Sequence, residues 1–485
     1  MYEAELLING ANRPAERNAT FELVSPVTGE IATVAAAASV ADATHAANAA
    51  AAAFPEWADS GPQERRACLN AAAEIVERRA EELQEVLVLE TGATREWGRF
   101  NTELAATVLR DAAAMTTRVS GEVLPSDRDG VTAFAMRQPA GVCLGIAPWN
   151  APVVLGVRAL AMPLACGNTV VLKASELCPK THHLVGEVMR EAGIPAGVVN
   201  VVNNAPANAR DVVETLIAHP AVRRVNFTGS TRVGREVAEL AARNLKRCLL
   251  ELSGSAPLLV LADADIDKAV KAAAYGAFMN QGQICMATER IIVMDDVADE
   301  FIDKFAREAR ALIAGDPRDR DTGHRLGTLI GNHAARRINT LVEDALVKGA
   351  VQVVGSGAEG VFMDATVIDH VTPAMNIYRE ECFGPVAVVI RVGSVDEAIT
   401  VANDCEFGLS ASVFSRDVVG ALSVARRIES GICHINGATV ADEPHAPFGG
   451  VKASGYGRFG GTAAIDEFTE LRWITIAGPE TQLSR

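Results

Sequence analysis

Several residue classes are scarce in this chain of 485 residues, and each shortage argues against a class of protein. Aromatic residues make up only 5 %, so Ala, Val, Leu and Ile must fill most of the interior. Basic residues are outnumbered, with 45 Lys and Arg against 61 Asp and Glu, which opposes binding to nucleic acid or to an anionic membrane. No apolar run approaches the ~20 residues that a bilayer-spanning helix needs. We therefore expect a soluble protein with neither nucleic acid nor membrane among its partners.

The cysteines are scattered: there are nine, an odd number, and none forms a CxxC pair. This pattern predicts neither a disulfide framework nor a metal site, and it is typical of a reducing cytoplasmic compartment. The first five residues are acidic and do not form the basic segment of a signal peptide, which agrees with a cytoplasmic location. Most thiols in such a protein are small buried hydrophobes, although one can serve as a nucleophile.

The length predicts two or three domains, and the hydrophobic content of 49 % is enough to bury large cores. From residue 142 onward, apolar strands alternate with helices, which is typical of a parallel doubly wound sheet. The predicted strands are 142–147, 169–173, 198–202, 222–227 and 247–252, and the helices between them are 152–165, 179–192, 208–218 and 231–243. A helical region covers 40–117 before this series, and a second α/β series begins after Gly254 and continues to residue 392.

Two reactive side chains stand next to glycine-containing turns. In Asn280–Cys285 an apolar helix ends and a turn presents a thiol, where Gly282 permits close approach of a substrate. Glu251 interrupts an apolar strand just before Gly254, so it faces the crevice in which α/β proteins bind ligands. An apolar setting raises the pKa of a carboxyl toward that of a general base. The alternatives are an inert buried cysteine and an edge carboxylate paired with an Arg.

Two further segments are suited to a dinucleotide. Val225–Gly234 reads as strand, glycine turn and helix start, and the free N–H groups of a helix start suit a pyrophosphate. Lys173–Glu176 follows the second strand, where an acid usually holds ribose hydroxyls. The alternatives are an ordinary N-capped turn and surface charge.

Seven motifs in a fixed order carry a resemblance. They are Pro148-Trp149-Asn150, Lys173-Ala174-Ser175-Glu176, Phe227-Thr228-Gly229-Ser230, Glu251-Leu252-Ser253-Gly254, Gly282-Gln283-Ile284-Cys285, Glu381-Cys382-Phe383-Gly384-Pro385, and Pro447-Phe448-Gly449-Gly450-Val451-Lys452 with Ser454-Gly455. On these motifs the chain resembles the aldehyde dehydrogenase superfamily over nearly its whole length. It departs from the common pattern in having Ser253 and Ser255 around Gly254, and Phe459 after Gly-Arg. These departures resemble the NAD-dependent bacterial branch that oxidises aromatic aldehydes of the salicylaldehyde, vanillin and benzaldehyde type.

The resemblance implies a mechanism that joins three of these residues. Cys285 would attack the aldehyde as a thiolate, and the amide of Asn150 with the backbone N–H of Cys285 would bind the oxyanion. Hydride transfer to NAD would leave a thioester, and Glu251 would activate the water that hydrolyses it.

The resemblance also implies a set of cofactor-binding residues. They are Ala147, Pro148, Trp149, Lys173, Ser175, Glu176, Gly229, Ser230, Gly234, Leu252, Glu381 and Phe383. Because Glu176 would repel a 2′-phosphate, we expect NAD rather than NADP as the cofactor.

Candidate substrate contacts are Trp97, Arg158 and Tyr456, which the resemblance places near the substrate tunnel. Trp97 could stack on an aromatic ring or pack between helices. Arg158 could meet a ring hydroxyl or carboxylate, or form a structural ion pair. Tyr456 would lie near the tunnel mouth.

The implied architecture is the α/β aldehyde dehydrogenase fold, with three parts. A Rossmann-like NAD-binding domain would cover 1–118 and 142–250, an α/β catalytic domain 251–440, and a small β oligomerisation element 119–141 and 465–485. An exposed β ribbon needs a partner edge, so a homodimer or homotetramer is expected.

Three alternatives remain open at this stage. The chain could be a CoA-acylating aldehyde dehydrogenase, although the presence of Glu251 argues against that branch. It could act on aliphatic aldehydes or semialdehydes. It could also be a non-catalytic binding or structural relative, although Cys285, Asn150 and Glu251 are all present.

Overall fold

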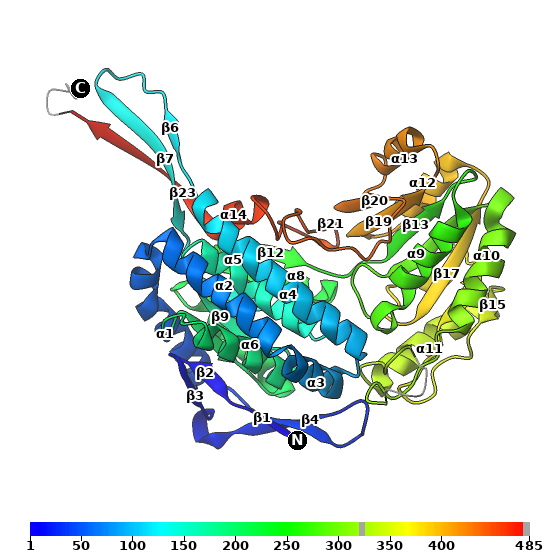
Figure 1. The fold of residues 1–485 in the computed structure, drawn as a ribbon, viewed down its shortest axis with the longest axis horizontal. Coiled ribbons are helices and arrows are strands. Elements are labelled where there is room, and N and C mark those ends of the chain that lie inside the picture. Colours follow the sequence, from blue (N-terminus) through cyan, green and yellow to red (C-terminus); the bar gives the residue numbers. More distant parts are fainter. Residues whose placement is uncertain (320–324, 479–485) are drawn as a thin grey trace.

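The structure is a computed structural model that describes residues 1–319 and 325–478. Two α/β bodies lie next to each other, and the chain passes from one to the other between β12 (Arg247–Glu251) and β13 (Ala256–Val260). A narrow β arm projects from the first body (Figure 1). Within the described residues, no helix is both long enough and apolar enough to cross a membrane.

The first body is built on an eight-stranded sheet whose five middle strands are parallel, in the order β12-β11-β8-β9-β10. Apart from β12, these are β8 (Val142–Ile146), β9 (Thr169–Lys173), β10 (Val199–Val202) and β11 (Val222–Thr228). The edges are completed by β22 (Gly455–Tyr456), β2 (Leu6–Ile8) and β3 (Ala11–Arg13). The chain forms β8 first and winds outward to both sides, so strand order reverses between β8 and β11. The predicted doubly wound parallel sheet is confirmed.

Helices cover both faces of this sheet, as strands buried on both sides require. One face carries α2 (Pro62–Arg78), α3 (Ala80–Thr91), α4 (Arg95–Met115), α5 (Pro152–Ala165) and α6 (Pro179–Glu191). The other carries α1 (Val40–Asp59), α7 (Ala209–Ala218) and α8 (Thr231–Arg243). Both α5 and α8 have the bounds that the sequence predicts. Pro152 at the first position of α5 and the Ser230 cap of α8 are strong start signals.

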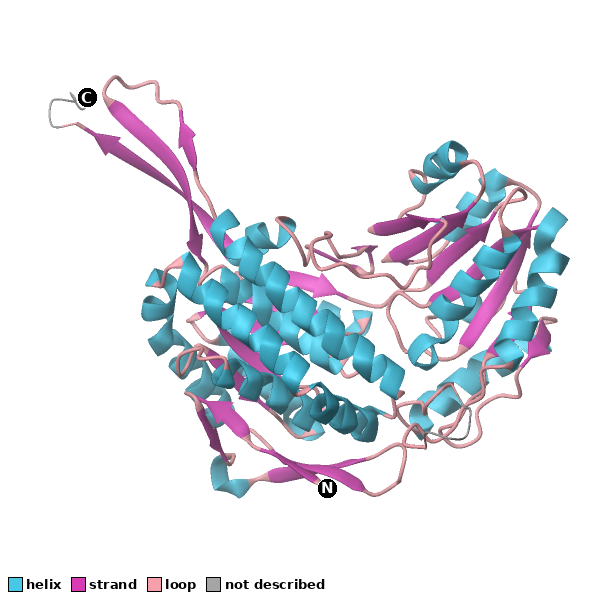
Figure 2. Cartoon of the chain, viewed as in Figure 1, coloured by secondary structure: helices cyan, strands magenta, loops and turns pink. Residues whose placement is uncertain are grey.

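The second body has a seven-stranded sheet in the order β15-β16-β17-β14-β13-β19-β20, parallel except for β15. Besides β13, the strands are β14 (Thr288–Met294), β15 (Val351–Val354), β16 (Thr366–Asp369), β17 (Val386–Val392), β19 (Ser410–Phe414) and β20 (Ile432–Ile435). On one face lie α9 (Ile266–Phe278) and α10 (Asp295–Arg310), and on the other α11 (Asn332–Val347), α12 (Val395–Asn403) and α13 (Val418–Ala425). Figure 2 shows the strands of this body sandwiched between its helices.

Smaller elements complete the chain. An N-terminal sheet joins β1 (Tyr2–Ala4), β5 (Ile31–Ala36) and β4 (Thr20–Val24), and β18 (Phe407–Gly408) pairs with β21 (Val451–Lys452). The arm consists of β6 (Glu122–Leu124), β7 (Val131–Pro139) and β23 (Thr469–Ala477), all antiparallel. Single 3₁₀ turns lie at Glu16–Asn18, Thr116–Arg118, Pro206–Asn208, Met279–Gly282 and Asn376–Tyr378.

The two ranges predicted for the oligomerisation element, 119–141 and 465–485, both contain strands of the arm. Residues 119–141 hold the hairpin of the arm, but the third arm strand begins at Thr469 rather than at 465. The segment before it is α14 (Ala463–Phe468), whose Ile465 and Phe468 are buried in the core of the first body. Within the predicted ranges, residues 320–324 and 479–485 lie outside the described residues.

Candidate active site

A groove crosses the carboxyl ends of β8 and β11, where strand order reverses and open α/β sheets bind their ligands. The segment after β8 supplies Pro148 and Trp149, and the turn after β11 supplies Gly229 and Ser230. These four residues line both of the cavities that make up the groove, so the cavities are continuous. The groove therefore suits an elongated ligand with two different ends.

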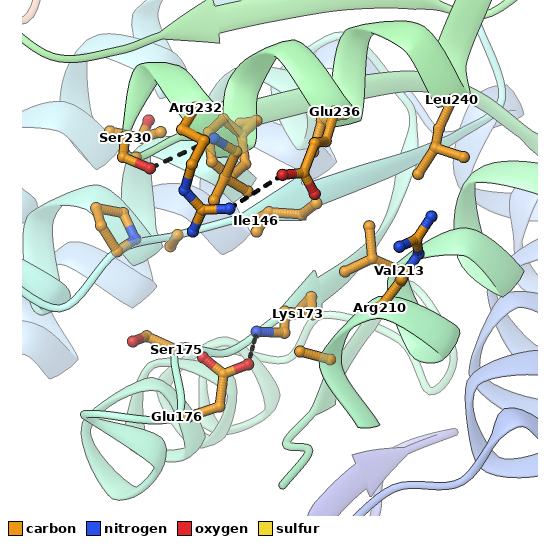
Figure 3. Close-up of a pocket in the computed structure, with 18 of the residues that line it drawn as sticks. Ile146, Lys173, Ser175, Glu176, Arg210, Val213, Ser230, Arg232, Glu236 and Leu240 are labelled. Carbon is orange, nitrogen blue, oxygen red and sulfur yellow. Dashed lines mark hydrogen bonds and ion pairs between the residues drawn. The ribbon is translucent and has the colours of Figure 1, made fainter. Parts of the chain in front are cut away.

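The end of the groove farther from Cys285 is charged. Lys173 is the last residue of β9 and Ser175 follows it, and Lys173 forms an ion pair with Glu176 (Figure 3). The amide of Asn204 donates a second hydrogen bond to Glu176, at 2.8 Å. Burial alone would raise the pKa of Glu176, but the charge of Lys173 and these hydrogen bonds lower it below its usual value. This end of the groove, whose wall also includes Ala147, therefore presents an ionised carboxylate.

The middle of the groove lies at the start of α8. The Ser230 hydroxyl caps this helix by accepting a bond from the N–H of Val233, at 3.4 Å. Gly234 is buried one turn further on, and a Cβ there would lie 2.3 Å from the side chain of Leu252. Gly234 thus acts through packing, since it allows α8 to approach the end of β12. The free N–H groups and positive end of this 13-residue helix suit an anion such as a pyrophosphate.

The other end of the groove is lined by Leu252, Glu381 and Phe383. Glu381 accepts a bond of 3.1 Å from the N–H of Gly254, and the rings of Phe383 and Trp149 meet edge to face with centroids 5.8 Å apart. Phe383 has a φ of 48°, a conformation that bulky residues rarely adopt. The surrounding contacts must therefore hold it in place.

One of those contacts is made by the buried carboxyl group of Glu289. It accepts a bond of 2.7 Å from the N–H of Phe383, and it is further bonded by the N–H of Cys382 and the hydroxyl of Ser255. Burial and the nearby Glu381 raise the pKa of Glu289 to about 8. Glu289 therefore fixes the loop that carries Glu381 and Phe383.

The segment before Cys285 is tightly folded. Asn280 and Gln281 have positive φ values of 49° and 55°, and a Cβ at Gly282 would lie 2.0 Å from the carbonyl of Gly384. A Cβ at Gly254 would likewise lie 2.1 Å from the carbonyl oxygen of Cys285. Glycine at these two positions lets the segment approach both Gly384 and the turn after Glu251.

Asn150 is anchored at both its backbone and its side chain. Its amide Nδ2 donates to the carbonyl of Gln283 at 3.0 Å. Its own carbonyl accepts from the indole N–H of Trp97 at 2.8 Å and from the amide of Asn280 at 3.0 Å. The amide of Asn150 is thereby held against the peptide that leads to Cys285.

The side chains of Asn150, Glu251 and Cys285 line the same cavity. Among the described residues, neither carboxyl oxygen of Glu251 has a hydrogen-bond partner. Burial raises the pKa of Glu251 well above the usual value, although Arg158 opposes the shift. Burial, Glu251 and Glu381 raise the pKa of the Cys285 thiol to about 12. The Cys285 thiol therefore holds its proton at neutral pH, and the Glu251 carboxylate has a raised affinity for a proton. Together they offer a nucleophile, an amide donor and a carboxyl group of raised basicity.

A pocket next to these residues has an aromatic wall. Trp97 stacks on Phe100 with ring centroids 4.8 Å apart, and Phe448 lies on the same cavity. Arg158 also lines it, with its guanidinium 4.7 Å from the centre of the Phe448 ring, and forms a buried 2.5 Å ion pair with Asp442. Arg158 and Trp97 thus each make a structural contact and also line the cavity, and their contact with a substrate stays a prediction.

Tyr456 is not brought to this pocket. It pairs with Leu250 at the outer edge of the first sheet, and 51 % of its surface is exposed. The residue opposite Glu251 is Gly455, so the side chain of Tyr456 lies on the other face of the sheet from that of Glu251.

With this geometry described, the chain can be compared with known proteins. It matches the Aldehyde dehydrogenase family over residues 13–474. The chain belongs to this family. It is 59 % identical over 476 residues to a vanillin dehydrogenase of Pseudomonas sp. HR199, covering 98 % of each protein. The resemblance inferred from the seven motifs is confirmed.

Two solved structures resemble this one closely. The crystal structure of a salicylaldehyde dehydrogenase from Pseudomonas putida G7, complexed with salicylaldehyde, superposes with a TM-score of 0.97 at 48 % identity and full coverage of both chains. The structure of PnpE in complex with nicotinamide adenine dinucleotide has a TM-score of 0.94 at 35 % identity, covering 99 % of each chain.

Sequence reasoning missed two residues of this aldehyde dehydrogenase. Glu289 carries the same signal as Glu251, a carboxylate inside an apolar strand, and that signal could have identified it. Asp442 lies in a loop rich in acids and prolines, 284 positions from Arg158, and no local pattern sets it apart. Its place on the cavity depends on the packing of distant segments.

Proposed function

We propose that this aldehyde dehydrogenase oxidises aromatic aldehydes to carboxylic acids, with NAD as the hydride acceptor. The observation that carries the proposal is that Cys285, Asn150 and Glu251 share one cavity at the end of a dinucleotide-sized groove. The relatives that act on vanillin and salicylaldehyde support the aromatic class of substrate. The aromatic wall of Trp97, Phe100 and Phe448 supports it as well.

The groove fits NAD by its donor set. Glu176 and Lys173 would hold the adenosine ribose, the start of α8 with Gly229 and Ser230 the pyrophosphate, and Glu381 with Phe383 the nicotinamide ribose and ring. Pro148 and Trp149, which line both cavities, would contact the middle of the NAD molecule between these two ends of the groove. NAD bound in this way would supply an acceptor for the hydride that leaves the substrate carbon.

In the first step, the Cys285 thiol would lose its proton to water, and the resulting thiolate would attack the carbonyl carbon to form a thiohemiacetal. An amide nitrogen carries two N–H groups, so Asn150 keeps one for the developing oxyanion while the other bonds Gln283. The backbone N–H of Cys285 would be the second donor. Donors fixed before the reaction stabilise the charge without reorganising, and one such donor contributes about 3 kcal/mol.

In the second step, loss of hydride leaves a thioester on Cys285, and Glu251 would take a proton from the attacking water. Its carboxyl has no hydrogen-bond partner to compete for its lone pairs, and its raised pKa makes it a stronger base once ionised. Water oxygen would form the new C–O bond, and the Cys285 sulfur would leave to give the free acid.

We also propose a homodimer or homotetramer with a NAD-binding domain (1–118 and 142–250), a catalytic domain (251–440) and an oligomerisation element (119–141 and 465–485). Within the described residues, β23 and β20 each form an outer edge of their sheets. On β23, Trp473 is 71 % exposed and Leu471 63 %. Pairing of β23 with β20 of a second copy would cover both edges.

A cytoplasmic location is part of the same proposal. All nine cysteines are free, as a reducing compartment keeps them.

The oligomeric state can be measured by sedimentation equilibrium on the full chain and on Trp473→Glu. We expect the substitution to dissociate the oligomer, and an unchanged mass would contradict pairing through this strand.

The activity itself is tested by NADH formation with benzaldehyde, salicylaldehyde, vanillin, a short aliphatic aldehyde and betaine aldehyde. We expect the aromatic substrates to have the highest kcat/KM and Cys285→Ala to be inactive with all of them. Best activity on the aliphatic compounds would remove the aromatic assignment. NADH formation that requires CoA and yields an acyl-CoA would instead identify an acylating enzyme.

A further inference from the structure

The carboxylate of Asp442 is bonded on one side only. Its Oδ2 accepts from Arg158 at 2.5 Å, and the two side chains are 6 % and 7 % exposed. Its Oδ1 is buried and has no hydrogen-bond partner in the part of the chain that the structure describes. Buried polar atoms are nearly always bonded, and an unpaired carboxylate oxygen is costly, so this atom needs a donor.

The position of Asp442 limits what that donor can be. Asp442 lines the pocket that also holds Cys285 and the rings of Trp97 and Phe448. The Arg158 guanidinium also lies over the Phe448 ring, 4.7 Å from its centre. This second contact restricts Arg158 from bonding both carboxylate oxygens of Asp442. Asp442, with its unpaired oxygen, therefore belongs to the wall that an aromatic aldehyde would touch when its carbonyl reaches Cys285.

We propose that Asp442 Oδ1 accepts a hydrogen bond from a hydroxyl group on the substrate ring, and so selects hydroxylated aromatic aldehydes over their ethers and over unsubstituted benzaldehyde. This inference rests on the proposed oxidation of aromatic aldehydes. It assigns Asp442 as a specificity-determining residue and Arg158 as the residue that positions its carboxylate.

Charge in the pocket supports a neutral hydroxyl rather than an anionic substituent. The positive charge of Arg158 is already compensated by the carboxylate of Asp442, so the pair does not offset the charge of a ring carboxylate. Asp442 would repel such a group, as would Glu251 once ionised. An ether oxygen can only accept hydrogen bonds, so it cannot satisfy Oδ1.

The test compares each hydroxybenzaldehyde with its own methyl ether, at the 2-, 3- and 4-positions. Assays run below the pKa of each ring hydroxyl, so that the donor is present. In the wild type we expect at least one hydroxy isomer to exceed its ether in kcat/KM by about tenfold or more. In Asp442→Asn the amide N–H₂ can face the substrate, so that ratio should fall to about one or below.

Glu443→Gln is the matched control, because it removes the same charge from the next residue, whose side chain is 71 % exposed. We expect it to keep the wild-type ratio. The ratio is internal to each variant, so partial loss of folded Asp442→Asn does not alter it. Differences in ring electronics cancel when the variant is compared with the wild type.

Three outcomes would overturn the inference: no hydroxy isomer exceeds its ether in the wild type, the preference survives in Asp442→Asn, or Glu443→Gln abolishes it. The first would mean that water alone satisfies Oδ1. In each case aromatic aldehydes are still oxidised and the proposed function stands. If no aromatic aldehyde yields NADH with the wild type, the proposed function itself fails.

Discussion

The side-chain amide of Asn150 donates a 3.0 Å hydrogen bond to the backbone carbonyl of Gln283, across 133 positions of the chain. This bond joins the segment after β8 in the first body to the segment that presents Cys285 in the second. It holds the Asn150 amide near the Cys285 thiol, although the two residues belong to different bodies of the structure. The geometry of the reaction thus depends on contacts between the two bodies.

Removing the Asn150 amide tests that geometry directly. Asn150→Ala should lower kcat by about 10²–10³-fold, the usual loss for one oxyanion donor. The KM for NAD should change little, because Asn150 lies at the substrate end. Trp97→Phe keeps a ring but removes the indole N–H that bonds the Asn150 carbonyl, so it should cause a smaller fall. Steady-state kinetics with benzaldehyde measure both, and a kcat within threefold of wild type for Asn150→Ala would contradict the assignment.

Glu251→Gln should separate the two chemical steps. Without the carboxylate, water activation slows, and steady-state kcat should fall by about 10²-fold or more. Formation of the thioester should persist, giving one burst of NADH per subunit and an acyl group on Cys285. Stopped-flow absorbance and intact-protein mass spectrometry detect these products. If kcat is unchanged, or no adduct forms while kcat falls, Glu251 has another role.

The same substitution should change the ionisation of Cys285. Burial, and then the negative charge of Glu251, raise the pKa of the thiol to about 12. Removing that charge should therefore lower the pKa and move the alkylation of Cys285 by iodoacetamide to lower pH. Peptide mass spectrometry follows the labelling of each cysteine. Cys68, whose pKa is raised by burial and Glu64, is the reference and should not shift. A Cys285 midpoint that stays at the wild-type pH would show that Glu251 carries no charge in that range.

Glu289 should matter through the loop it holds. Glu289→Ala removes the acceptor for the Phe383 N–H, and leaving that buried donor unpaired costs about 1–3 kcal/mol. We expect the KM for NAD to rise about tenfold while kcat at saturating NAD falls much less. Glu289→Gln keeps an acceptor oxygen and should restore most of the affinity. Equal effects of Gln and Ala would mean that the charge, rather than the hydrogen bond, is required.

Glu176 should decide between the two dinucleotides. An ionised carboxylate beside the adenosine ribose repels a 2′-phosphate, so kcat/KM should favour NAD over NADP. Glu176→Gln should raise the NADP to NAD ratio by about tenfold or more, since it removes the repulsion and retains a hydrogen-bonding group. Initial rates with both cofactors provide the comparison. A wild-type preference for NADP would refute the role given to Glu176.

Local signals predict the elements around the groove well. Helix α5 starts at a proline and α8 at a serine cap, and their bounds agree with the prediction. The alternation of strands and helices also predicts the doubly wound parallel sheet, but the strand order around the groove is seen only in the structure. By contrast, the two-residue strand β22, which joins the far C-terminal part to β12, is too short to show a pattern.

Long-range contacts explain what the sequence leaves out. The pairing of Arg158 with Asp442 and the clamp of Glu289 on Phe383 are set by tertiary packing, and the chain around each residue looks ordinary. Tyr456 illustrates the reverse case. Its place in the family motif region suggested the tunnel mouth, but strand pairing with Leu250 directs it to the sheet edge.

The close approach of Gly254 to the Cys285 carbonyl has a practical consequence for anyone redesigning this enzyme. A side chain of any size at position 254 would start 2.1 Å from a backbone oxygen that cannot move without displacing the thiol. In a mutagenesis library that varies this codon, most variants would therefore be inactive. Codons 100 and 448, whose side chains border the pocket, offer better positions at which to alter the range of aldehydes.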